Sequence, residues 1–257
     1  MSHMPHGVKF RVEFVLENDD ELDAYEPPTT TSNISHLSMN IVDYFDLNHC
    51  TLVLNNTLKS LTLPHLSKLS FSVREFPRDR ICWPHAGFMA CAHRSSFQTS
   101  LESLLLEEVV ITEVELLACL AAVPSLKYLS IGDHQSIPGS HGEEKDHGVD
   151  HHLTTNSLLS KLTLVPGSAS LSAQALIPNL RTLTFRSRLQ FDDNVFLDFV
   201  LSRRVQPTSR PLTCLVEWLA GDFREIDVDV SARLRELRAG REAIVCFSAG
   251  YSGNSED

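Results

Sequence analysis

Two hydrophobic spacings alternate along residues 101–131, which read LESLLLEEVVITEVELLACLAAVPSLKYLSI. The first six residues follow an L-x-x-L-x-L pattern, in which residues two apart face the same side of a β-strand. The apolar positions after Thr112 follow a helical spacing instead, and Glu115 three residues later completes a capping box. Pro124 ends this helix, because the residue before a proline avoids helical geometry. LKYLSI at 126–131 restarts the strand pattern, so the segment predicts a strand–helix–strand unit.

The strand pattern recurs along most of the chain, as it does in repeat proteins. Clear copies begin at residues 66, 101, 126, 159 and 180, and weaker copies begin at residues 34, 47 and 212. From residue 66 onward they recur every 21 to 35 residues, a range that brackets the leucine-rich repeat. We therefore predict an α/β fold, a leucine-rich-repeat-like solenoid over 34–247, with a curved parallel sheet on one face and helices on the other.

Two stretches depart from this regular spacing. LKSLTL at 58–63 also fits the pattern, but it begins only 8 residues before LSKLSF at 66–71, which predicts a connection rather than a full repeat. Only seven residues separate the copies at 34–39 and 47–52. This gap is too short for a helix with its turns, so we predict a degenerate repeat there.

Further elements complete the predicted solenoid. The stretch 191–204 predicts a helix that Asp192 caps, with Phe191 and Phe196 placed to pack across the cap. Residues 1–33 predict an N-terminal strand followed by an irregular or capping segment, and 248–257 predict a disordered tail. The remaining expected elements are helices at 83–96 and 229–240 and strands at 8–14 and 243–247.

Composition narrows the possible partners and the compartment. The 257 residues carry a formal net charge of -11, which disfavours nucleic acid as the main partner. No run of 18 apolar residues predicts a membrane span, and the N-terminus lacks the pattern of a signal peptide. The six cysteines are scattered without the spacing of a disulfide framework, so we expect reduced thiols. We therefore expect a cytoplasmic or nuclear protein with no membrane contact.

Two histidine-containing segments are candidates for metal binding. The insertion at 132–152 mixes histidines with acidic residues, and His147 and His151 are four apart, as helical metal ligands are. No H-E-x-x-H motif accompanies them, so the composition favours a solvated insertion between two repeats. The alternative is a metal-dependent enzyme that uses this loop. A second set, Cys82, His85, Cys91 and His93, has its last pair too close together for a usual zinc site, and we assign it no metal.

No motif in the chain predicts catalysis. The sequence lacks a nucleophile elbow, a phosphate-binding P-loop and a dinucleotide fingerprint. We therefore expect no enzymatic activity, no catalytic residues and no cofactor, and a binding function carried by a surface.

The residues between the leucines of each strand predict that surface. The leucines point into the core, so the residues between them line the concave face, where repeat proteins bind their partners. Among the predicted residues, tyrosine and arginine are the expected energetic anchors. The predicted partner-binding residues are Lys68, Ser70, Ser103, Leu105, Tyr128, Ser130, Lys161, Thr163, Thr182, Thr184 and Arg186. We expect the protein that carries them to be a monomer.

Several segments resemble one protein family. LTLPHLSKLSFSV, SLESLLLEEVVITEVELLACLAAVPSLKYLSI, IPNLRTLTF with FDDNVFLDFVLSRR, and VSARLRELRAG are similar to the leucine-rich region of fungal F-box proteins. The resemblance covers roughly residues 34–247. It implies a region that binds the protein to be ubiquitinated by a cullin-type ligase.

The resemblance does not extend to the F-box itself. In that family the F-box is a short helical module that docks on a Skp-type adaptor, and we find none in residues 1–33. A Skp-type adaptor is therefore expected as a partner only if a longer chain supplies an F-box. The alternative is a free-standing leucine-rich-repeat interaction protein without a ligase link.

Overall fold

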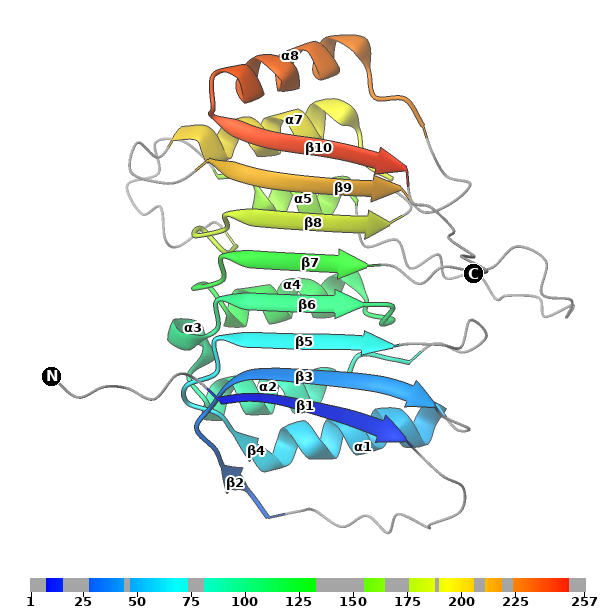
Figure 1. The fold of residues 1–257 in the computed structure, drawn as a ribbon, viewed down its shortest axis with the longest axis vertical. Helices are drawn as coiled ribbons and strands as arrows, with labels where there is room; N and C mark the ends of the chain where they lie inside the picture. The colour runs from blue at the N-terminus through cyan, green and yellow to red at the C-terminus, as the bar shows by residue number, and fades with distance from the viewer. Residues whose placement is uncertain are drawn as a thin grey trace, which may run out of the picture.

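An eight-stranded parallel sheet organises the molecule (Figure 1). The structure, a computed structural model, describes residues 8–15, 28–43, 47–73, 81–132, 155–164, 176–187, 190–205, 211–218 and 224–249. Every pairing between neighbouring strands of this sheet is parallel. In spatial order, which is also chain order, the strands are β1 (Val8–Val15), β3 (Ile34–Asp43), β5 (Lys68–Val73), β6 (Ser103–Glu107), β7 (Tyr128–Gly132), β8 (Thr182–Ser187), β9 (Leu212–Trp218) and β10 (Ala243–Ala249).

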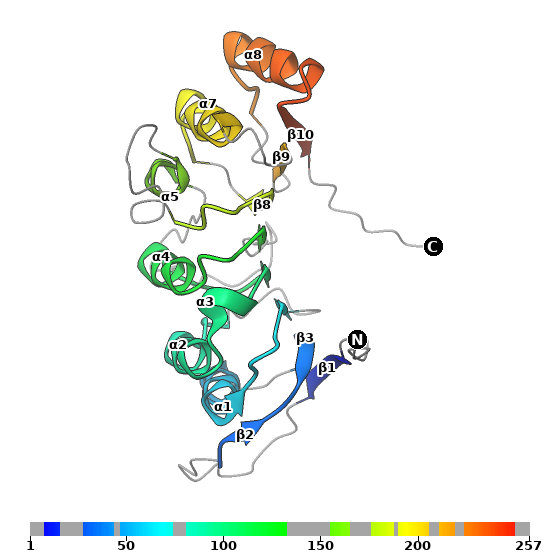
Figure 2. The same ribbon diagram turned by 90° about the vertical axis from the view of Figure 1, so that its left-hand side faces the viewer.

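The helices of the described residues cover one face of this sheet (Figure 2). Parallel strands need a crossover connection, and crossovers of one hand that always advance in the same direction place their helices on the same side. Seen along its edge in Figure 2, the sheet bends at both ends away from the helices, so its other face is concave. The helices are α1 (Leu47–Ser60), α2 (His85–Arg94), α3 (Phe97–Ser100), α4 (Glu113–Ala122), α5 (Asn156–Leu162), α7 (Asp193–Ser202) and α8 (Val228–Ala239).

The core lies between the sheet and the helix layer. Leu104 and Leu106 of β6 point into it from one strand, while the residues between and beside them remain at least partly exposed. From the helix side, Leu116 and Leu120 of α4 are also fully buried. Each such side chain contributes roughly 1.5–3 kcal/mol by leaving water, so strand alternation and helix periodicity together fix which face is covered.

The predicted strand–helix–strand unit is confirmed in detail. The hydroxyl of Thr112 accepts a hydrogen bond from the Glu115 amide at 3.2 Å, and the Glu115 carboxylate accepts one from the Thr112 amide at 3.0 Å. The side chains on either side of this cap, Ile111 and Leu116, are both buried. The helix predicted at 191–204 and its cap are also confirmed: Asp192 accepts hydrogen bonds from the amides of Asn194 and Val195 at the start of α7.

Two arginines close helix ends in the same way. Arg94, at the end of α2, donates to the carbonyls of Leu58, Lys59 and Leu61 at the end of α1. Arg203, which follows α7, donates to the carbonyl of Leu162 at the end of α5. The last carbonyls of a helix have no partner inside it, so each arginine supplies donors that the helix itself lacks.

A serine adjacent to each of these arginines makes an equivalent hydrogen bond in the two helix pairs. Ser95 and Ser202 accept hydrogen bonds from the amides of Leu63 and Leu164, just beyond α1 and α5. The α1–α2 and α5–α7 pairs therefore use the same connection. The sequences at these two connections are also similar: LKSLTLP at 58–64 and LSKLTLVP at 159–166.

Two predicted strands are helices. The copy at 47–52 forms the first turns of α1, and the copy at 159–164 lies mostly within α5. L-x-x-L-x-L places its first two leucines three residues apart, which also suits one face of a helix, so a short run does not distinguish the two structures. Thr155, whose hydroxyl accepts from the Leu158 amide, is the cap that marks the second helix.

The frame of the copy at 212–217 is wrong by one residue. β9 buries Cys214 and Val216, whereas Leu215, predicted to be internal, is 42% exposed. A slip of one residue sends every side chain of a strand to the opposite face.

The ends of the fold partly match the predictions. β1 forms as expected and pairs with β3, so the N-terminal strand belongs to the eight-stranded sheet. The short strand β2 (Thr30–Thr31) pairs with β4 (Leu61–Thr62), which follows α1. Ser248 belongs to β10 rather than to a tail. Of the insertion predicted at 132–152, Gly132 is the last residue of β7, and residues 133–152 lie outside the described residues, as do residues 250–257.

Candidate functional site

The face of the sheet opposite the helices, called here the open face, presents three rows of side chains that cross the strands. The amino row is Lys9, His36, Lys68, Ser103, Tyr128, Thr182, Thr213 and Ile244. The central row is Arg11, Ser38, Ser70, Leu105, Ser130, Thr184, Leu215 and Cys246. The carboxyl row is Glu13, Asn40, Ser72, Glu107, Gly132, Arg186, Glu217 and Ser248. Since strand register is unbroken from β3 to β10, the three rows run straight across the face.

Most of the predicted partner-binding residues lie on this face. Arg186 belongs to the carboxyl row, and the others fall in the amino and central rows. Those in the amino row are Lys68, Ser103, Tyr128 and Thr182, and those in the central row are Ser70, Leu105, Ser130 and Thr184.

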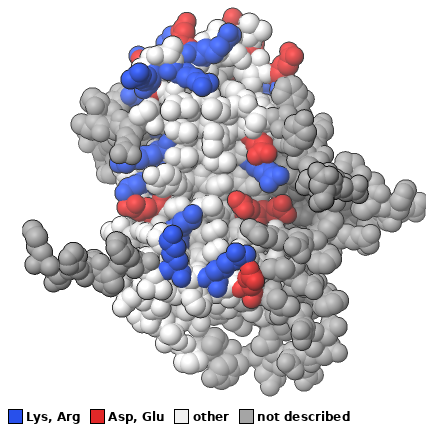
Figure 3. All heavy atoms as spheres, viewed as in Figure 1, with Lys and Arg blue, Asp and Glu red and all other residues white. Residues whose placement is uncertain are grey.

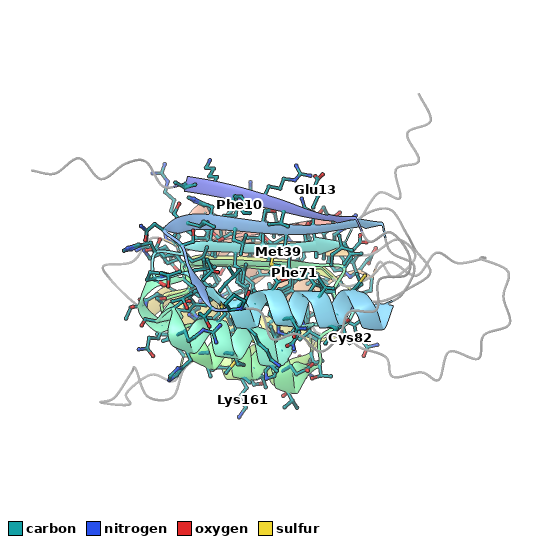
Figure 4. All side chains as sticks on the ribbon, turned by 90° about the horizontal axis from the view of Figure 1, so that it is seen from below. Phe10, Glu13, Met39, Phe71, Cys82 and Lys161 are labelled. Atoms are coloured by element: carbon teal, nitrogen blue, oxygen red, sulfur yellow. The ribbon has the colours of Figure 1, made fainter. Side chains whose placement is uncertain are left out.

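Lys161 and Thr163 are corrections to the predicted surface. Lys161 lies on α5, and Figure 4 shows it projecting from the helix layer, on the side opposite Glu13. The Thr163 hydroxyl donates to the Leu159 carbonyl at 2.8 Å, which closes the end of α5. Neither residue belongs to the open face, because the segment that carries them is a helix rather than a strand.

A groove follows the amino and central rows. Its larger part has a volume of about 480 Å³ and reaches from His36 to Thr182 and Thr184. A second part, of about 360 Å³, lies over β1 and β3 and is lined by Lys9 and Arg11 among others. Both parts are lined by His36 and Lys68, so they adjoin one another over β3 and β5, and the two together are called the groove.

Over most of the open face, charged side chains flank a pale central band, and basic groups interrupt that band toward β1 (Figure 3). From Ser38 to Cys246 the central row contains no charged residue. Some marginal charges are paired: Lys127 Nζ lies 2.5 Å from Glu102 Oε1, and Arg186 Nε lies 3.8 Å from Glu217 Oε1. From β3 onward the central row is therefore neutral and rich in hydroxyls, whereas charged side chains lie at the borders of the groove and at its β1 end.

Glu108, just beyond β6, has a perturbed carboxyl group. Burial raises its pKa, the Arg186 charge opposes this shift, and the neighbouring Glu107 charge adds to it. Its backbone is also left-handed, with φ 59°. This carboxyl borders the carboxyl row and does not line the groove.

One contact near the groove joins a serine hydroxyl and a histidine ring, the two groups that act as nucleophile and base in serine hydrolases. The Ser35 hydroxyl lies 2.8 Å from Nδ1 of His36, and it also donates to the Val8 carbonyl at 3.2 Å. A serine nucleophile needs a histidine that a third group orients. Among the described residues, no carboxylate forms an ion pair with His36, so we assign this contact no chemistry.

The cysteine and histidine residues at 82–93 do not assemble into a site. Within the described part of the chain, no group of three or more His, Cys, Asp and Glu side chains is placed to hold a metal ion. Instead, His85 lies 3.7 Å from the Cys119 thiol, to which Trp83 donates its indole N–H at 3.3 Å. Burial raises the pKa of Cys119 to about 12, so this thiol stays protonated and unreactive at neutral pH. His147 and His151 lie outside the described residues.

The open face contains residues that the sequence did not predict. His36 and Ser38 occupy the positions between the core residues of the weak copy at 34–39, so the strand pattern was sufficient to place them on the open face. Lys9 and Arg11 come from β1, which the sequence placed outside the repeats, and only the pairing of β1 with β3 brings them to the groove.

Comparison of the chain with family models, with curated proteins and with solved structures found no match. No helix in the described ranges combines the length and the apolar character needed to span a membrane.

Proposed function

We propose that this chain is a non-catalytic leucine-rich-repeat-like solenoid that binds a partner protein on its open face. Its resemblance to the repeat region of fungal F-box proteins suggests that the partner is a protein to be ubiquitinated. The observation that carries the proposal is the one-sided sheet: strands in chain order, helices on one face, and a concave face lined by small hydroxyls.

The side chains of the groove suit recognition of a protein surface. Tyr128, 44% exposed at the centre of the face, offers an aromatic ring together with a hydroxyl. Such residues are frequent energetic anchors in interfaces, whereas the surrounding serines and threonines add hydrogen bonds without large steric demand. Leu105 beside it supplies apolar contact.

Quantitative affinity capture tests the proposal. Wild-type protein, Tyr128→Ala and Lys161→Ala serve as baits in a fungal extract, and the captured proteins are compared by mass spectrometry. We expect a protein that the wild type and Lys161→Ala retain and that Tyr128→Ala loses by roughly thirtyfold, since truncating an interface anchor costs about 2 kcal/mol. If every captured protein binds the three baits equally, open-face binding is wrong.

The same capture separates the two forms of the proposal. Recovery of a Skp-type adaptor and a cullin with the bait supports a role in ubiquitin-ligase targeting. Their absence, with a Tyr128-dependent partner present, supports the alternative of a free-standing repeat interaction protein.

A further inference from the structure

The β1–β5 end of the groove is basic in a protein of net charge -11. Lys9, Arg11 and Lys68 all line it, and His36 lies among them. Within the part of the chain that the structure describes, no carboxylate lies within 4 Å of the Lys9 or Lys68 ammonium group, whereas Arg11 pairs with Glu13 at 2.6 Å. Two exposed ammonium groups therefore face the groove with no carboxylate partner among the described residues.

The β6–β8 end of the same groove has a different character. Leu105 and Tyr128 provide the apolar and aromatic surface there, and Ser103, Ser130 and Thr182 surround them with hydroxyls. Glu102 also lines this end, and its carboxylate is paired with Lys127 at 2.5 Å. The groove thus changes from cationic to neutral and partly apolar along its length. A ligand that complements it would change in the same direction, from anionic to apolar.

The length of the groove suits a short extended peptide. It crosses six strands from β1 to β8, and neighbouring strands lie about 4.8 Å apart, so the crossing is roughly 24 Å. An extended chain advances about 3.3 Å per residue, so about seven residues span that distance. Such a peptide would run across the strands, over the amino and central rows.

We propose that this groove binds an extended acidic peptide segment of the partner protein. Its Asp or Glu side chains lie over Lys9, Arg11 and Lys68, and an apolar side chain packs on Leu105 and Tyr128. The inference rests on the proposed function, which it deepens by giving the chemistry of the partner. A nucleic acid strand is the competing polyanion, and the negative charge of the whole protein disfavours it.

A peptide array tests the charge preference directly, because it needs no identified partner. The array carries random ten-residue peptides that span a wide range of net charge, with oligothymidylate spots as a nucleic-acid arm. The proteins applied are the wild type, the double variant Lys9→Glu/Lys68→Glu, Tyr128→Ala and the helix-side control Lys161→Glu. Lys9, Lys68 and Lys161 are all exposed, so the charge reversals leave the core intact, and thermal unfolding checks this.

The expected result is binding that rises with peptide negative charge and with the presence of an apolar residue. The double variant loses roughly tenfold or more of the signal for acidic peptides at low salt, and the difference shrinks at high salt as screening grows. Lys161→Glu keeps the wild-type profile, and Tyr128→Ala weakens binding of peptides that contain an apolar residue.

Three results would overturn the inference. One is a signal that does not depend on peptide charge or on Lys9 and Lys68; if Tyr128→Ala still removes it, open-face binding stands and only the acidic partner is wrong. Another is oligothymidylate binding as strong as acidic-peptide binding. A third is no peptide binding at all, which removes the extended-peptide inference and leaves the capture of a folded partner as the test of the proposed function.

Discussion

Arg203 is the polar residue whose loss we expect to destabilise the fold most. It is 7% exposed and donates to four backbone carbonyls, those of Leu162, Leu176, Ile177 and Pro178. Burial lowers its pKa to about 10, partly offset by the nearby Cys214, so the guanidinium remains charged at neutral pH. The hydrogen bonds therefore compensate the cost of burying this charge.

Replacing Arg203 with Met keeps the apolar stem and removes every donor. The carbonyls of Leu162, Leu176 and Pro178 then lose the Arg203 donors, whereas the Ile177 carbonyl still accepts from the Leu180 amide at 3.2 Å. Each carbonyl that loses its donor and that water does not reach costs about 1–3 kcal/mol. If two of the other three stay dry, their lost hydrogen bonds lower the free energy of unfolding by about 4 kcal/mol, and removal of the buried charge returns part of this loss. A loss of this size is a large fraction of the roughly 5–15 kcal/mol that keeps a domain folded.

Urea unfolding followed by circular dichroism measures this loss, and the next residue provides a matched control. Arg204 is exposed and pairs with Glu242 at 2.5 Å, a surface ion pair worth about 0.2–1 kcal/mol. We expect Arg204→Met to move the midpoint only slightly and Arg203→Met to move it several times further. Equal midpoints for the two variants would show that Arg203 does not hold the carbonyls as described.

Three smaller predictions concern caps, strain and pH. Thr112→Ala removes the α4 capping box and should lower the unfolding free energy by about 1 kcal/mol in urea, with Thr112→Ser close to wild type. Glu108→Asn should raise the unfolding free energy by about 1 kcal/mol at pH 7, because asparagine tolerates the left-handed backbone and carries no charge. Burial raises the pKa of Glu108, so folding disfavours its charged form, and the gain should shrink as the pH falls and the wild-type carboxylate is protonated. For Asp193, burial acts to raise the pKa, but hydrogen bonds from Arg224 and the Asp227 amide outweigh it and lower the pKa. The Asp193 contribution to stability is thus present above about pH 4 and lost as the pH falls through the lowered pKa, so the stability gap between wild type and Asp193→Asn should close in acid titration followed by fluorescence.

The sequence predicted those parts of the fold in which apolar and polar residues alternate without ambiguity. In β5 and β7, leucine and its aromatic or β-branched partner alternate with Lys68, Ser70, Tyr128 and Ser130, so the inward and outward sides were assigned correctly. The prediction failed in β9, where Leu215 is apolar on the open side and the pattern could slip by one residue.

The helix α5 was missed for a different physical reason. Its buried residues Leu159 and Leu162 satisfy a helical spacing as well as the strand pattern, and Leu158 is buried with them. The Thr155 cap and the packing of α5 against α7 decide between the two, and only the cap is visible in the sequence.

The basic end of the groove could not be derived from local pattern. Lys9 and Arg11 come next to His36 and Ser38 because β1 pairs with β3, across more than twenty residues of chain. A register between segments so far apart is a tertiary property, set by the apolar faces of both strands together.

Site-specific photo-crosslinking measures most directly whether a partner occupies the open face. A photoreactive phenylalanine analogue placed at Ser130, in the middle of the central row, is compared with the same residue placed at Lys161 on the helix side. We predict a crosslinked partner protein from position 130 that is absent from position 161 and disappears with Tyr128→Ala. Crosslinks to the same partner from position 161 alone would contradict binding on the open face and assign the interaction to the helix layer.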